Sequence, residues 1–229
     1  MKVCKHLLRN DVPAEGQLKG GDNVSFDLTD GADLKILFLG NSITRHGVNE
    51  SLGWFGDWGM AASEKERDYV HRLVKLFEDT GRKVSFCTAN LSDWERTRDM
   101  SLLETEYRSA REFGAELIIV RLGENAGLAE NEDAFEKCYM DMVGYFSADG
   151  AKVVLTDLFW EYEPFDGFVK ELAKERGYIF VELHDLGDKA EMKAVGRFSH
   201  AGVDAHPGDA GMDEIAQRIF RAAAGSTKL

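Results

Sequence analysis

The sequence is poor in cysteine and in proline. Its cysteines, Cys4, Cys87 and Cys138, are an odd number spread widely over 229 residues, a spacing that fits neither a disulfide framework nor a zinc site. Cys87 and Cys138 lie within apolar patterns, where a small buried hydrophobic side chain is the expected role. The chain has only 3 prolines, so no proline-rich linker divides it.

Long apolar runs and an excess of basic charge are also missing. No stretch is long enough to span a bilayer, and the first residues lack the apolar core and cleavage site of a secretory signal. We therefore expect a cytoplasmic protein with no membrane partner. Asp and Glu number 41 against 28 Lys and Arg, which gives a formal net charge of −13. An acidic surface repels phosphate backbones, so nucleic acid is not an expected partner.

Motifs for cofactors and metals are absent as well. The sequence has no GxGxxG or P-loop pattern, no EF-hand loop and no cluster at metal-ligand spacing. It also has no internal repeat and no low-complexity segment. We therefore expect neither a cofactor nor a bound metal.

What the sequence does contain is an alternation of short apolar runs and amphipathic segments. It predicts a three-layer α/β/α sandwich around a five-stranded parallel sheet, formed by residues 34–229. Residues 1–33 look irregular and are expected to pack on this domain, with a short strand at 24–28. The strands are expected at 35–40, 83–89, 116–122, 151–157 and 178–183, and the helices at 64–80, 100–113, 134–146, 165–176 and around 215–220.

Local signals set the limits of one of these helices. Ser63 followed by Glu66 has the spacing of a capping box, so it predicts the start of the helix at 64–80. Gly81 predicts its end. Asp209 is expected to cap the last helix.

Polar residues follow the first and third predicted strands, and a further polar block precedes the last helix. Gly40-Asn41-Ser42 ends the first, Gly123-Glu124-Asn125 ends the third, and His206-Pro207 leads into the last helix. Ligands of parallel α/β sheets bind at the carboxyl ends of the strands. A serine at such a place can also simply cap a helix, but the three segments together favour a reactive site.

These segments resemble the motifs of the SGNH or GDSL-like hydrolases. The family's first block reads GNSIT here, its asparagine block reads GEN, and its histidine block reads HPGDAGM. The three occur in the family's order and over residues 34–222, nearly the whole domain. The resemblance implies a flavodoxin-like fold and a serine esterase that needs no cofactor.

The resemblance also implies roles for individual residues. Ser42 would be the nucleophile and His206 the general base that activates it. The Asn125 amide and the Ser42 backbone N–H would stabilise the oxyanion. The family takes a further backbone N–H from a glycine after the second strand. The segment here, 90–95, has no glycine, and spacing alone suggests Glu95.

The group that orients His206 is ambiguous in the sequence. The family usually has an aspartate three residues before the histidine, but this chain has Val203 there. Asp204, two residues before, is one candidate for a Ser42–His206–Asp204 triad. Asp157, Asp185 or a backbone carbonyl are the alternatives, and a carbonyl would leave a Ser–His dyad.

The loop at 45–62 is rich in aromatic residues and glycine. Trp54, Phe55 and Trp58 are expected either to wall a substrate cleft beside Ser42 or to cover the core or a contact in a homo-oligomer. Met60 and Phe55 would shape a small acyl pocket. His46, in the same loop, is expected to touch substrate or solvent.

The sequence thus predicts an ester hydrolase that removes a small acyl group, such as acetyl, from a carbohydrate or similar polar alcohol. The alternative is a binding protein of the same fold whose catalytic machinery is impaired, which the missing aspartate and glycine favour. A flavodoxin-like phosphate-binding domain is a third reading, but it gives the histidine block no role.

Overall fold

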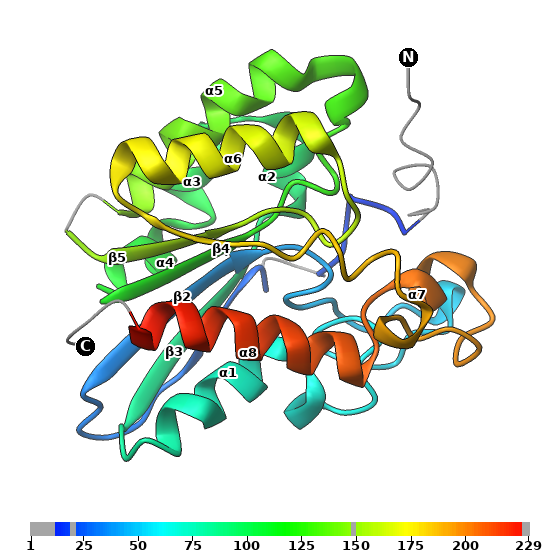
Figure 1. Cartoon of the computed structure of the whole chain (residues 1–229), viewed down its shortest axis with the longest axis horizontal. Helices are drawn as coiled ribbons and strands as arrows, with labels where there is room; N and C mark the ends of the chain where they lie inside the picture. Colours follow the sequence, from blue (N-terminus) through cyan, green and yellow to red (C-terminus); the bar gives the residue numbers. More distant parts are fainter. Residues whose placement is uncertain (1–11, 19–21, 148–149, 226–229) are drawn as a thin grey trace.

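The computed structural model describes residues 12–18, 22–147 and 150–225, which form a sheet between two layers of helices (Figure 1). The sheet has six strands in the order β1-β3-β2-β4-β5-β6. Five of them are parallel, and β1 pairs antiparallel with β3 at one edge. The strands are β1 (Val24–Asp27), β2 (Leu34–Gly40), β3 (Val84–Asn90), β4 (Leu117–Arg121), β5 (Lys152–Thr156) and β6 (Ile179–Val181).

The helices divide between the two faces of the sheet (Figure 1). One face is covered by α1 (Tyr69–Glu78) and α8 (Asp209–Gly225), and the other by α5 (Leu128–Phe146) and α6 (Glu163–Arg176). Shorter helices complete the second layer or the connections: α2 (Ser92–Thr97), α3 (Ser101–Thr105), α4 (Arg108–Glu112) and α7 (Ala201–Ala205), with 3-10 turns at Glu50–Leu52, Lys65–Arg67 and Ala190–Met192.

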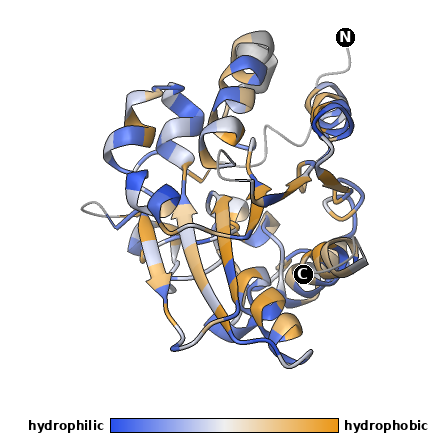
Figure 2. Cartoon of the chain, turned by 90° about the vertical axis from the view of Figure 1, so that its left-hand side faces the viewer, coloured by the Kyte–Doolittle hydropathy of each residue, from blue (hydrophilic) through white to orange (hydrophobic). Residues whose placement is uncertain are grey.

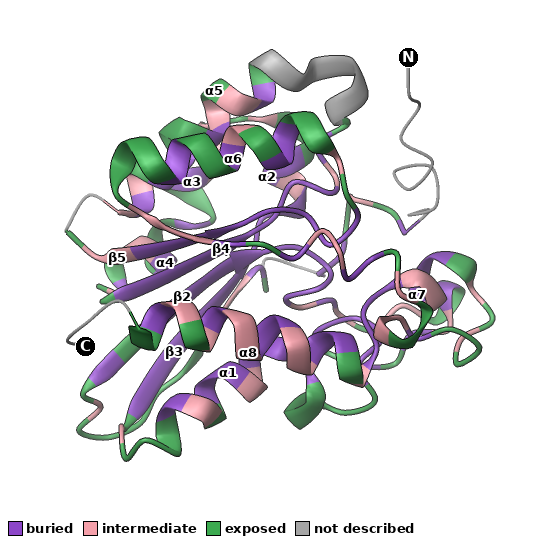
Figure 3. Cartoon of the chain, in the orientation of Figure 1, coloured by how far each residue is buried: buried purple, intermediate pink, exposed green. Residues whose placement is uncertain are grey.

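The four central strands, β2 to β5, are buried on both faces, as the continuous apolar runs predict. In β2, Leu34, Ile36 and Phe38 pack toward α1 and α8, while Leu37 and Leu39 pack toward α5 and α6. Figure 2 shows the hydrophobic stretches along the strands, and Figure 3 shows the same strands buried. Alternating side chains thus join two apolar clusters through one sheet.

The predicted fold class is confirmed, with one strand more than the five expected. The sixth strand, β1, lies within residues 1–33, at the place where the sequence predicts a short strand. It pairs Val24 with Ala89 and Asp27 with Phe86. Residues 1–11 and 19–21 of that segment lie outside the described residues. Within the part of the chain that is described, no helix is both long and apolar enough to cross a bilayer.

Two helix predictions were wrong in detail. The helix expected from residue 64 begins at Tyr69, because Asp68 caps it by accepting the His71 N–H. Ser63 instead donates its backbone N–H and its hydroxyl to Asp209. The helix expected over 100–113 is two short helices, α3 and α4.

Candidate active site

Ser42 lies directly after the carboxyl end of β2, in a tight turn. Gly40 pairs in register with Asn90 of β3 and Arg121 of β4, so the three strands end level. A Cβ at Gly40 would lie 2.9 Å from the Arg121 carbonyl and would overlap Thr44, so only glycine fits. The Asn41 carbonyl then accepts the N–H groups of Thr44 and Arg45. This turn holds Ser42 at the edge where ligands bind in such sheets.

The Ser42 hydroxyl is hydrogen-bonded to His206. Ser42 Oγ and His206 Nε2 are 2.9 Å apart, although 164 residues separate them in the sequence. On the other side of the ring, Nδ1 lies 2.7 Å from the Gly202 carbonyl oxygen. A carbonyl can only accept, so Nδ1 carries the proton and Nε2 has the lone pair that accepts from Ser42.

The end of α7 explains why the Gly202 carbonyl is available. The chain leaves the helix at His206, whose backbone is extended and whose N–H bonds to Val203 rather than to Gly202. The last carbonyls of a helix lack intrahelical partners. The imidazole of His206 therefore satisfies one of them with its own N–H.

His206 is held in its neutral form. Its side chain has 0% exposure, and burial lowers its pKa to about 3. The hydrogen bond to Gly202 opposes this shift, whereas the nearby His46, Arg121 and His200 add to it. An imidazole that is neutral at pH 7 is ready to accept a proton from Ser42.

The structure does not bring Asp204 to His206, so that part of the predicted triad is wrong. The Asp204 carboxylate accepts the backbone N–H groups of Gly196, Arg197 and Phe198 and thereby fixes that loop. A side chain two residues before the histidine points away from the ring here. The backbone carbonyl named as an alternative takes the place of the acid.

The other two acids considered for this role are also engaged elsewhere. Asp157 accepts from the Leu183 N–H and from His184 Nδ1, the latter at 2.7 Å. Asp185 pairs with Lys189 and Arg218. Neither carboxylate is bonded to His206.

Glu95 lies at the site, but not through the group that was predicted. Its backbone N–H donates to the Leu91 carbonyl within the first turn of α2, so it is not available to an oxyanion. Its carboxylate, with 0% exposure, accepts from Asn125 Nδ2 at 2.8 Å. Asn125 is partly exposed, and its Nδ2 has a second hydrogen to donate.

A buried ion pair lies beneath the turn that carries Ser42. Arg121 has 0% exposure and pairs with the buried Glu124. Asn41 joins them by accepting from Arg121 and donating to Glu124 at 2.7 Å. Burial lowers the pKa of Arg121 to about 10, while Tyr69, Glu95 and Asp157 oppose the shift. Sequence reasoning missed this network, although Arg121 in an apolar strand was a signal for it.

Two of the three aromatic residues of the loop, Trp54 and Phe55, line no pocket beside Ser42 among the pockets of the described residues. Trp54 is buried in an apolar cluster with Leu52 and Met60 and donates its indole N–H to the His46 carbonyl, so it packs the core. Phe55 is 70% exposed. An aromatic side chain from another part of the chain, Trp160, packs edge-on against His206, with 5.4 Å between the two ring centroids.

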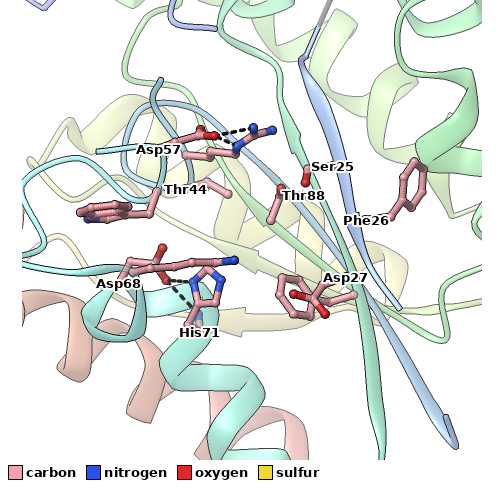
Figure 4. Close-up of a pocket in the computed structure, with 12 residues that line it drawn as sticks. Ser25, Phe26, Asp27, Thr44, Asp57, Asp68, His71 and Thr88 are labelled. Carbon is pink, nitrogen blue, oxygen red and sulfur yellow. Dashed lines mark hydrogen bonds and ion pairs between the residues drawn. The ribbon is translucent and has the colours of Figure 1, made fainter. Parts of the chain in front are cut away.

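Trp58 lines a pocket on the α1 side of the sheet, near β1. Figure 4 shows this pocket, in which Arg45 is paired with Asp57 and His71 with Asp68. Hydroxyl groups and charges of both signs surround the opening. The lining residues are Ser25, Phe26, Asp27, Thr44, Arg45, Asp57, Trp58, Lys65, Asp68, His71, Phe86 and Thr88.

The other residues considered from the sequence, His46 and Cys87, are buried in the protein. His46 is 2% exposed and bonds to the Gly47 carbonyl through Nδ1, so it is a buried residue rather than a loop side chain in solvent. Among the residues that the structure describes, no group of three or more His, Cys, Asp or Glu side chains is placed to hold a metal ion. Cys87 is a free, buried cysteine, and burial raises its pKa to about 12.

The fold, but not the sequence, matches known proteins. No protein-family model and no curated protein matches the chain. A lipase, Lip_vut3, from a goat rumen metagenome is 18% identical, with a TM-score of 0.55 over 82% of this chain and 97% of its own. A protein assigned to the G-D-S-L lipolytic family from Desulfitobacterium hafniense DCB-2 is 13% identical, with a TM-score of 0.50 over 83% and 99%. The predicted resemblance to GDSL-like hydrolases is thus confirmed for the fold.

Proposed function

We propose that this chain is a carboxylic ester hydrolase in which Ser42 is the nucleophile and His206 the general base. The observation that carries the proposal is the pair of hydrogen bonds on the His206 ring, to Ser42 at 2.9 Å and to the Gly202 carbonyl at 2.7 Å. A nucleophile, a base within hydrogen-bond reach and a group that orients the base are the parts that acyl transfer requires.

The reaction follows from this geometry. Ser42 Oγ attacks the ester carbonyl carbon while its proton moves to His206 Nε2, and the carbonyl oxygen becomes an oxyanion that accepts from Asn125 Nδ2. When the intermediate collapses, Nε2 returns the proton to the leaving alcohol and an acyl-Ser42 remains. Water then attacks the acyl group while Nε2 takes its proton, and when this second intermediate collapses Nε2 returns the proton to Ser42 Oγ as the acid leaves.

The dyad has a mechanistic cost relative to a triad. The Gly202 carbonyl fixes the tautomer of His206 as an aspartate would, but it carries no full negative charge. It therefore stabilises the developing imidazolium less, and burial disfavours that cation further. We expect a slower enzyme than one with a carboxylate at this position.

We propose further that the acyl group is small, such as acetyl, and that the alcohol is a carbohydrate or a similar polar molecule. Ser42 is 2% exposed and Trp160, which packs on His206, is 5% exposed, so little room surrounds the hydroxyl. The pocket around Trp58, whose lining includes Thr44 and Arg45 of the segment after Ser42, combines an indole with hydroxyls and both signs of charge. Such a lining suits a polyhydroxylated ring.

The second candidate is a binding protein of the same fold with impaired catalysis. The near-complete burial of Ser42 and His206 and the carbonyl in place of an acid favour it. Hydrolysis of p-nitrophenyl acetate by the wild type and by Ser42→Ala separates the two. We expect turnover that Ser42→Ala removes, while equal rates for the two proteins would favour the binding protein.

The proposed substrate class has its own test. Acetylated sugars and p-nitrophenyl esters of increasing acyl length should be compared as substrates of the wild type and of Trp58→Ala. We expect activity to fall with acyl length, and Trp58→Ala to raise KM for the acetylated sugar without changing it for p-nitrophenyl acetate. A preference for long acyl chains would contradict the small acyl pocket, and an unchanged KM would remove Trp58 from the substrate site.

A further inference from the structure

The carboxylate of Glu95 is surrounded by hydrogen-bond donors. It accepts from Asn125 Nδ2 at 2.8 Å, from Asn41 Nδ2 at 3.2 Å and from the Gly123 N–H. These donors come from the turn after β2 and the segment after β4, while Glu95 itself lies on α2 after β3. One buried carboxylate thus ties together the ends of three adjacent strands.

These partners suit the ionised form of Glu95. Each of them is an N–H group, so a proton on the carboxyl would have no acceptor among them. Burial is the largest influence on the pKa of Glu95 and its net shift is upward, although Asn125, Gly123, Asn41 and the positive Arg121 all oppose that shift. Burying a carboxylate without such donors would be far more costly.

An acceptor at this place decides how the Asn125 amide is oriented. Because Glu95 can only accept, the amide must turn Nδ2 toward it rather than Oδ1. One hydrogen of Nδ2 then goes to Glu95, and the plane and direction of the other hydrogen are fixed. A preorganised donor is what an oxyanion requires, because no reorientation is then needed in the transition state.

The same carboxylate also fixes the residue that precedes the nucleophile. Asn41 donates Nδ2 to Glu95 and Glu124 and accepts through Oδ1 from Arg121 and the Ile43 N–H. An aspartate at position 41 would direct an acceptor at two carboxylates. The asparagine of the G-N-S segment therefore matches Glu95, and the turn carrying Ser42 is held by the same contacts as Asn125.

We propose that Glu95 is a positioning residue that orients the Asn125 amide toward the oxyanion and holds it in register with the Ser42 turn. This inference rests on the proposed function, in which Asn125 stabilises the oxyanion. Glu95 acts on the reaction through Asn125, its contact with Asn41 serving to keep that amide in register with the Ser42 turn, and it does not itself touch the substrate.

A double-mutant cycle tests the proposal. Glu95→Gln keeps the shape of the side chain but sets an amide against donors, so Asn125 loses its fixed orientation. We expect kcat to fall about 10-fold or more with KM little changed, because the contact matters in the transition state. In an Asn125→Ala background the same substitution should change kcat by less than about threefold, since its effect passes through Asn125. Additive losses, or an unchanged kcat in Glu95→Gln, would overturn the proposal.

A matched control and a second readout separate positioning from general destabilisation. Asp93→Asn, on the same helix α2, should leave kcat within about twofold. Hydrogen exchange of the Asn125 side-chain amide, assigned by its loss in Asn125→Ala, does not depend on activity. We expect a protected Nδ2 hydrogen in the wild type and in Asp93→Asn, and faster exchange in Glu95→Gln. Unchanged exchange in Glu95→Gln would overturn the proposal. The two proposals can also fail separately. If exchange is slow only when Glu95 is present but the protein shows no Ser42-dependent hydrolysis, the orientation of Asn125 is supported and the proposed function is refuted.

Discussion

His184 and His206 each donate Nδ1–H across 2.7 Å, but to opposite kinds of acceptor. His184 donates to the carboxylate of Asp157 and lines a pocket with Glu161, Glu163, Asp166 and Glu182. His206 donates to a backbone carbonyl and faces Ser42. The histidine with a carboxylate partner is therefore not the one that holds the serine. An Asp–His pair alone does not identify a catalytic base.

The two partners also shift the two imidazoles in opposite directions. Burial acts to lower the pKa of His184, but the hydrogen bond and charge of Asp157 outweigh it and the net shift is upward. For His206, burial dominates and lowers the pKa to about 3. The surroundings of His184 favour its protonated form relative to a free imidazole, whereas those of His206 favour the neutral form, which can take the proton of Ser42.

The largest expected effect is the contrast between the two histidines in catalysis. His206→Gln removes the base, so kcat/KM for an ester should fall about 10³-fold or more. His184→Gln should change it by less than about threefold, because that ring lies in a different pocket. Ester hydrolysis by both purified variants measures this, with circular dichroism to establish folding. Similar losses in the two variants would break the comparison.

The next effect concerns the oxyanion rather than the base. Asn125→Ala should lower kcat about 10²-fold with KM nearly unchanged, because the amide contact strengthens only when the oxyanion forms. Steady-state kinetics on one ester checks this. A kcat equal to that of the wild type would remove Asn125 from the mechanism.

The pH dependence sharpens the electrostatic side of the comparison. A base with the ordinary histidine pKa near 6.5 would lose about 30-fold in kcat/KM between neutral pH and pH 5. His206, with a pKa lowered to about 3, stays neutral over that range, so we expect kcat/KM to change by less than about threefold.

The measurement is kcat/KM against pH from 5 to 8 on an uncharged ester, with His184→Gln as the control for the other histidine. An acid limb centred near pH 6.5 that persists in His184→Gln would show that His206 is not held neutral by burial.

The smallest effect expected on catalysis is that of Asp204. Asp204→Asn should lower kcat/KM less than about fivefold, far below the roughly 10⁴-fold loss when the acid of a complete triad is neutralised. It should lower the melting temperature instead, since its carboxylate holds the N–H groups of Gly196, Arg197 and Phe198. Steady-state kinetics and thermal unfolding of the same Asp204→Asn sample distinguish a catalytic role of this residue from a structural one. A loss near the triad value in folded protein would restore Asp204 as the orienting acid.

Much of the fold could be predicted because the apolar runs that form strands are buried on both sides. Each of the five parallel strands contains residues of a predicted run, and the ends of those runs placed Ser42 and Asn125 at one edge of the sheet. The capping box failed because Asp68 competes for the start of α1, while Ser63 finds a distant partner in Asp209. Local spacing does not reveal such a tertiary contact.

The sequence predicted the parts of the site in which a side chain acts directly. It did not predict the parts that depend on a backbone group or on a buried hydrogen-bond network. Ser42 and His206 meet as the motifs suggested, but a sequence does not show which carbonyl the end of α7 leaves for His206. Glu95 was expected near the site through its N–H, whereas the helix α2 uses that group and turns the carboxylate inward. Trp54 resembled a cleft residue because its indole suits either a cleft or a core.

The central claim is that His206, oriented by the Gly202 carbonyl, activates Ser42. Covalent labelling with a fluorophosphonate tests this claim most directly. The activated hydroxyl should attack phosphorus and displace fluoride, giving a phosphonyl adduct that mass spectrometry assigns to Ser42. We expect this adduct in the wild type, none in Ser42→Ala, and labelling slowed about 10²-fold or more in His206→Gln. The absence of any adduct on Ser42 in folded wild-type protein, or equal labelling rates in the wild type and His206→Gln, would contradict the account.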